Sequence, residues 1–184
     1  MAYTLKQKKA YQVAYGVTHP LLLLSLVPLL ATLVEGGDMQ AVLLWNGLLV
    51  GIFVIPLYLV YKWKEAELPT IISATVLGLL YFAVAIVWGA PWSLIVCMIA
   101  GITCSIVSLI VHQFVQPVSL YVLMIAGATI ALTYTSLMAG LIMMPLGFAS
   151  TWVNVQLGNA DLIDVVLGWG VAMISVLVPF AFLL

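Results

Sequence analysis

Between Glu67 and Asp161 the chain carries no lysine, arginine, aspartate or glutamate. Charged residues make up only 6% of its 184 positions and hydrophobic residues 66%, and the mean hydropathy is +1.29. A soluble domain is about 45–50% apolar and about 25% charged. One soluble core of this length could not bury so much apolar side chain, so the sequence predicts an integral membrane protein.

Apolar runs of membrane-spanning length recur along the chain, separated by charged, proline or polar segments. A transmembrane helix needs about 20 apolar residues. The runs that fit are roughly 17–34, 41–61, 70–88, 92–111 and 162–184. The first 16 residues, with three lysines and three tyrosines, predict an amphipathic cytoplasmic lead-in, and residues 17–184 a single transmembrane helical domain.

The uncharged stretch from Val118 to Asn154 is too long for one span at about 1.5 Å per residue. Its polar cluster, Thr133-Tyr134-Thr135-Ser136, predicts a tight turn with a short helix on either side and Pro145 in the second. A single broken helix is the alternative. The fold class is therefore an all-α polytopic bundle of six or seven spans.

The lysines predict how this bundle lies in a plasma or inner membrane. Cytoplasmic flanks carry the excess of lysine and arginine. Lys6, Lys8 and Lys9 precede the first span, and Lys62 and Lys64 follow the second, so with seven spans both groups and the N-terminus face the cytoplasm. The same count places the segments around Pro117 and from Gln156 to Asp164 on that face.

The composition also argues against some classes of binding partner, nucleic acid among them. The chain has no arginine, which removes the bidentate clamps that usually grip phosphate or carboxylate groups. A net charge of −1 without a basic patch argues against binding of nucleic acid. Cys97 and Cys104, seven residues apart in one apolar run, are typical of buried thiols rather than a disulfide.

The segment "DVVLGWG", from Asp164 to Gly170, resembles the start of the final helix in the type 2 phosphatidic acid phosphatase superfamily. These membrane lipid phosphatases carry the motifs K-x6-R-P, P-S-G-H and S-R-x5-H-x3-D. Pro69, Pro117, Asp164 and Gly168 match in order and spacing. The resemblance implies a similar membrane fold and a lipid or polyisoprenoid partner.

The catalytic positions of that family are changed in this chain. With Asp164 in the motif's aspartate position, the nucleophilic histidine becomes Ala160, and the motif's arginine and serine become Asn154 and Val153. Losing preorganised cations costs several kcal/mol of barrier each, and no phosphoenzyme forms without the nucleophile. The resemblance therefore implies a non-catalytic lipid-binding or scaffold protein.

The other two motifs have also lost their reactive residues. Leu68 stands where the first motif has arginine, and Tyr61 takes its lysine position with Lys62 beside it. After Pro117, Ser119 is the only hydroxyl where the second motif has Ser-Gly-His.

Six residues are the candidates for ligand binding, and the aspartates and lysines among them have a structural alternative. Carboxylates in the first turn of a helix cap free N–H groups, and lysines beside a span are a solvated flank. His19 and His112 raise haem ligation as a minor alternative, but we expect no cofactor and no metal. The candidates are Asp161, Asp164, Asn154, Ser119, Lys62 and Lys64.

Two further functions compete with lipid binding. An accessory subunit of a larger, energy-transducing membrane complex would suit the nearly charge-free spans. A small-solute channel or transporter is the weaker alternative, because transport sites usually contain ionisable residues deep within the membrane, and here none lies away from the ends of a predicted span.

Overall fold

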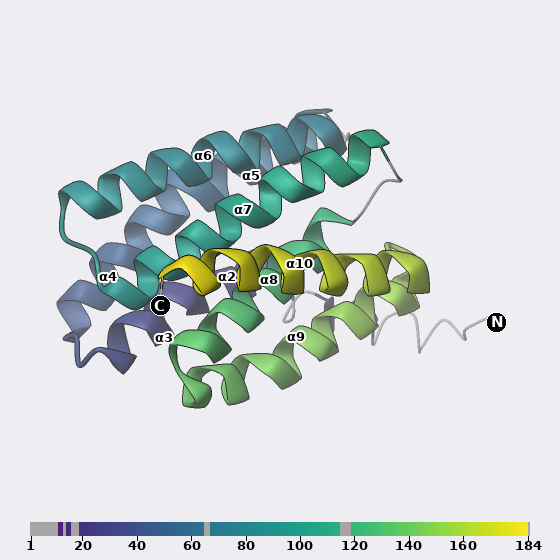
Figure 1. The fold of residues 1–184 in the computed structure, drawn as a ribbon. Helices are drawn as coiled ribbons and strands as arrows, with labels where there is room; N and C mark the ends of the chain where they lie inside the picture. Colours follow the sequence, from purple (N-terminus) through teal and green to yellow (C-terminus); the bar gives the residue numbers. More distant parts are fainter. Residues whose placement is uncertain (1–10, 13, 16–18, 65–66, 115–118, 184) are drawn as a thin grey trace.

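The computed structural model describes residues 11–12, 14–15, 19–64, 67–114 and 119–183, and every regular element in these ranges is helical. Figure 1 shows the helices packed as one bundle. The elements are α2 (Pro20–Leu24), α3 (Leu26–Val34), α4 (Met39–Leu48), the π-helical η1 (Leu49–Val54), α5 (Ile55–Lys64), α6 (Glu67–Val87), α7 (Trp92–Phe114), α8 (Leu120–Thr135), α9 (Leu137–Leu157) and α10 (Leu162–Leu183).

Helix lengths and composition fit an integral membrane protein. Among the described residues, four helices are long and apolar enough to cross a membrane: 39–63, 68–87, 92–114 and 137–157. Three further apolar helical stretches, 22–34, 122–135 and 162–178, are shorter. The all-α class is confirmed, whereas six or seven spans stay a prediction, and most of the lead-in at 1–16 lies outside the described residues.

The predicted turn in the long uncharged stretch is confirmed. Ser136 is extended (φ −155°, ψ 120°), and this breaks the chain into α8 and α9. The Ser136 side chain accepts a hydrogen bond from Ala139 N at 3.4 Å, which caps α9. α9 is longer than predicted, at 21 residues, and contains Pro145.

The first predicted span, 17–34, is not one helix. α2 ends at Leu24 and α3 begins at Leu26, with the Ser25 hydroxyl donating to Leu22 O at the break. Pro28 explains the break, because it has no N–H for the carbonyl of Leu24 and its ring clashes with that group in a regular helix.

Another proline accounts for η1 inside the second span. Ile55, the residue directly before Pro56, donates its N–H to Val50 O, five residues earlier, which is the hydrogen bond of a π-helix. A regular α-helix would press the Pro56 ring against the carbonyl of Ile52. The wider π-turn avoids that clash, so the helix continues across the proline.

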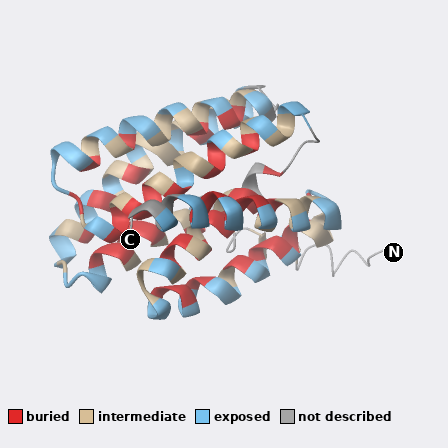
Figure 2. Cartoon of the chain, in the orientation of Figure 1, coloured by how far each residue is buried: buried red, intermediate tan, exposed pale blue. Residues whose placement is uncertain are grey.

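α8 forms the centre of the bundle and packs against α7, α9 and α10, with α2 and α3 beside it. Among the side chains described in α8, only Tyr134 is exposed, whereas Val122, Ile125 and Leu132 are almost fully buried. Figure 2 shows buried residues where these helices face one another, while α6 carries mostly exposed and intermediate positions.

Two glycines allow the helices around α8 to approach closely. A Cβ added to Gly140 of α9 would lie 2.5 Å from Thr133 Cα, and one added to Gly168 of α10 would lie 2.7 Å from Val122 Cγ1. Real Cβ contacts are essentially never shorter than 3.0 Å. Gly168 therefore has a packing role in the bundle.

The loop between α3 and α4 fastens onto the start of α7. The Glu35 carboxylate accepts hydrogen bonds from Trp92 N, at 3.0 Å, and from Ser93 N. Ser93 Oγ donates in turn to Ala31 O at 2.9 Å. Because the first N–H groups of a helix have no partner within it, Glu35 caps α7 from a distant part of the sequence.

Candidate functional site

Asp161 and Asp164 form a reciprocal cap at the start of α10. Asp164 N donates to Asp161 Oδ1 at 2.7 Å, and Asp161 N donates to Asp164 Oδ2 at 3.0 Å. This is the capping-box arrangement, with aspartate in place of the usual pair of residues. Carboxylates there also complement the helix dipole. The capping interpretation of both residues is confirmed.

Asn154 has a structural role in the turn between α9 and α10. Its side chain is 2% exposed, and its Nδ2 donates to Ser150 O at 2.9 Å. Asn159 donates twice to Asn154, from the backbone N to O at 2.9 Å and from Nδ2 to Oδ1 at 3.4 Å. Gly158, with φ 74°, supplies the left-handed residue that the turn needs. The Asn154 amide is therefore engaged within the turn.

Ser119 and Lys62 make no described contact with this turn. Ser119 precedes α8, is buried, and its carbonyl accepts from Leu123 N at 3.1 Å. Lys62 is exposed near the end of α5, and Lys64 ends that helix. Within the described ranges, no hydrogen bond or ion pair joins Ser119 or Lys62 to the two aspartates.

The helix ends that carry the candidates nevertheless gather at one end of the bundle. Successive helices reverse direction from α5 to α10, so the end of α5, the starts of α8 and α10 and the end of α9 come to the same end (Figure 1). The candidate residues therefore lie in the same region of the bundle, but they do not form one cluster of contacting side chains. In the described part of the chain, no three His, Cys, Asp or Glu side chains are grouped to hold a metal ion.

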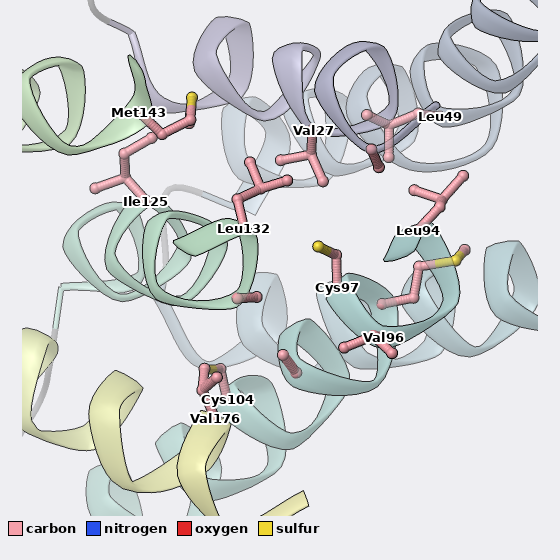
Figure 3. Packing of buried hydrophobic residues seen from close by; sticks show 14 of the residues in the cluster. Val27, Leu49, Leu94, Val96, Cys97, Cys104, Ile125, Leu132, Met143 and Val176 are labelled. Carbon is pink, nitrogen blue, oxygen red and sulfur yellow. The ribbon is translucent and has the colours of Figure 1, made fainter. Parts of the chain in front are cut away.

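The structure contains a pocket that the sequence did not indicate. It has a volume of about 100 Å³ and is lined by α2, α3, η1, α6, α7 and α8, with Leu49 at the junction of α4 and η1. In Figure 3, Val27 and Leu49 lie on one side, and Leu94 and Cys97 lie across from them. Because the lining comes from six elements spread over 105 positions, from Leu24 to Ala128, no local motif marks it.

The pocket wall is apolar and its few oxygen atoms are already bonded. Tyr81 OH donates to Trp45 O at 2.9 Å, and Ser105 Oγ donates to Gly101 O at 3.0 Å. Cys97 and Cys104 contribute free, buried thiols, which behave as small apolar groups. No lysine, arginine, aspartate, glutamate or histidine belongs to the lining. Such a wall can hold apolar matter and offers nothing to a charged group.

Comparison of the chain with protein-family models, with curated proteins and with solved structures finds no match.

The capping box makes a testable prediction. Asp161→Ala removes the acceptor for Asp164 N and is expected to lower the free energy of unfolding by about 1 kcal/mol. Asp161→Asn should be nearly neutral, because asparagine caps as well as aspartate. Reversible unfolding in mixed micelles, followed by tryptophan fluorescence, measures both. Equal losses for the two variants would mean that the charge, rather than the cap, matters at this position.

Proposed function

We propose that the chain is an integral membrane protein that binds a membrane lipid or polyisoprenoid and has no chemistry of its own. The observation that carries this proposal is the apolar pocket, whose wall has no charged group and no unbonded oxygen. A site of this kind suits the hydrocarbon portion of a lipid, since burying a polar group without a partner costs several kcal/mol.

A degenerate relationship to the type 2 phosphatidic acid phosphatases is part of the same proposal. It rests on Pro69, Pro117, Asp164 and Gly168, and on the changed residues Ala160 and Asn154. The bonding of Asn154 to Ser150 and Asn159 supports a non-catalytic protein, because its amide already serves the turn. Phosphoryl transfer would also need cations positioned at the developing charge.

The orientation proposed from the sequence places the N-terminus in the cytoplasm of a cell with a plasma or inner membrane. It rests on the lysines, which gather before the first apolar run and after the second. Because the helix ends that carry Lys62, Ser119 and Asp164 lie at one end of the bundle, this orientation would place them all at the cytoplasmic surface.

Native mass spectrometry after purification in a gentle detergent tests this function. We expect the chain to retain lipid in stoichiometric amount, and lipid extraction then identifies it. A parallel assay with phosphatidic acid and isoprenoid pyrophosphates should release no phosphate above a protein-free control. Loss of all lipid under conditions that keep the chain folded would contradict lipid binding, and genuine turnover would contradict the non-catalytic assignment.

A role as accessory subunit of a membrane complex is the second candidate, favoured by the outer face of α9. Large apolar side chains are exposed there in close succession, and Phe148 stacks on Trp169 of α10 with ring centroids 4.7 Å apart. Partner subunits that appear in fixed ratio in the same mass spectra would decide for this role. The exposed side chains are Leu137, Met138, Leu141, Ile142, Met144, Phe148 and Trp152.

A further inference from the structure

The position of the pocket along the helices shows which part of a lipid could reach it. At about 1.5 Å per residue, Ala74 and Tyr81 lie roughly 10 and 21 Å from the start of α6, which is about 30 Å long. Leu94 and Ser105 lie roughly 3 and 20 Å from the start of the antiparallel α7. On α6 the pocket therefore occupies the middle levels, roughly 10 Å or more from the helix start that follows Lys62, whereas on α7 it extends almost to the helix start.

The pocket is also accessible from the side of the bundle, at Gly101. This glycine lies near the middle of α7, is exposed, and belongs to the pocket lining. A Cβ added to it would meet nothing within 4 Å. In a membrane, the surface at this level faces hydrocarbon, so an acyl chain could enter without crossing a polar region.

From the position of the pocket, its apolar wall and its access at Gly101, we propose that it binds a segment of an apolar lipid chain, acyl or isoprenyl. The polar headgroup remains outside the pocket. The inference rests on the proposed lipid-binding function and assigns the contact to the tail. A headgroup would leave its charge among Leu94, Met98 and Leu123 with no partner, and burying an unpaired charge is costly.

The size of the pocket fits a segment rather than a whole lipid. An apolar cavity of about 150 Å³ in a soluble protein stays dry and takes up benzene or xenon. At about 100 Å³, this pocket is somewhat smaller, so it suits the end or a bend of a chain whose remainder lies along the exposed flank. Specificity would then arise from chain shape rather than from hydrogen bonds.

Photocrosslinking with position-labelled lipids tests the proposal. The full chain is reconstituted in phosphatidylethanolamine–phosphatidylglycerol vesicles that contain a phosphatidylethanolamine probe with a diazirine either at the end of one acyl chain or beside the headgroup. A second arm uses an isoprenyl pyrophosphate with a terminal diazirine, which separates the two sources of chain. We expect the tail probe to label peptides lining the pocket at least fivefold more than the headgroup probe.

The matched variants are Gly101→Leu and Gly170→Leu. Both glycines are exposed, both lie within helices, and a Cβ added to either meets nothing within 4 Å, but only Gly101 lines the pocket. Gly101→Leu should fill the pocket and reduce its labelling at least fivefold, with Gly101→Ala giving a smaller reduction. Gly170→Leu should label as the wild type does.

Unchanged labelling in Gly101→Leu, or tail labelling spread evenly over the outer helix faces, would overturn the assignment of the tail to the pocket. Such a result is distinguishable from failure of the proposed function, because a chain that binds lipid elsewhere would still retain it in native mass spectra. A chain that retains no lipid would overturn both.

Discussion

Replacing Gly140 with alanine is expected to lower the free energy of unfolding by about 3 kcal/mol, near the upper end of the usual range for overpacking. The new methyl group would lie 2.5 Å from Thr133 Cα and 2.6 Å from Thr133 Cβ. A flexible side chain could swing away, but Thr133 Cα belongs to the backbone of α8, so the two helices must separate. Reversible unfolding in mixed micelles measures the loss.

Gly170→Ala is the control for this substitution. Gly170 is also within a helix, but a Cβ there meets nothing within 4 Å. Alanine at an open helical position favours the helix by roughly 0.5–1 kcal/mol over glycine. The two variants should therefore shift stability in opposite directions. A neutral Gly140→Ala would show that α8 and α9 do not pack as closely as the structure indicates.

The second large effect is expected from Glu35→Ala, which should cost about 2 kcal/mol. The carboxylate accepts from two backbone N–H groups at the start of α7, Trp92 N and Ser93 N. Loss of a single side-chain cap costs about 0.5–2 kcal/mol, and here a charge that complements the helix dipole is lost as well. Amide hydrogen exchange should accelerate at both residues.

Asp38→Ala provides the comparison for Glu35. Asp38 caps α4 locally, accepting from Ala41 N at 2.8 Å, so its loss should cost about 1 kcal/mol and leave exchange at Trp92 and Ser93 unchanged. If Glu35→Ala left those amides protected as well, water or another group would have to serve the start of α7, and the tertiary cap would be unimportant for stability.

Features set by local sequence were predictable. The apolar runs predicted the helices, Thr133–Ser136 predicted the turn between α8 and α9, and Asp161 and Asp164 predicted the start of α10. Each depends on residues within one or two helical turns of one another. The break at Ser25 was missed because the run around it is uniformly apolar. Pro28 was the local sign of this break in the sequence.

Features made by distant residues were not predictable from one sequence. Glu35 is 57 positions from Trp92. The sequence around Glu35 shows only an acidic residue in a loop. The sequence around α7 shows only that Pro91, the residue before the helix, has no side chain that can cap it. The pocket has no signal at all, because Val27, Gly78 and Leu123 become neighbours only when the bundle forms. The sequence correctly placed the candidate residues near the ends of helices. It could not predict which of these residues contact one another.

The short central helix has a consequence for the thickness of the surrounding bilayer. α8 contains 16 residues, or about 24 Å at 1.5 Å per residue, against a hydrocarbon layer of about 30 Å. A helix this short in contact with lipid would force the bilayer to thin. Because α7, α9 and α10 pack around α8, lipid meets the longer helices instead. The mismatch of α8 is absorbed inside the protein, and the longer outer helices set the bilayer thickness that the bundle prefers.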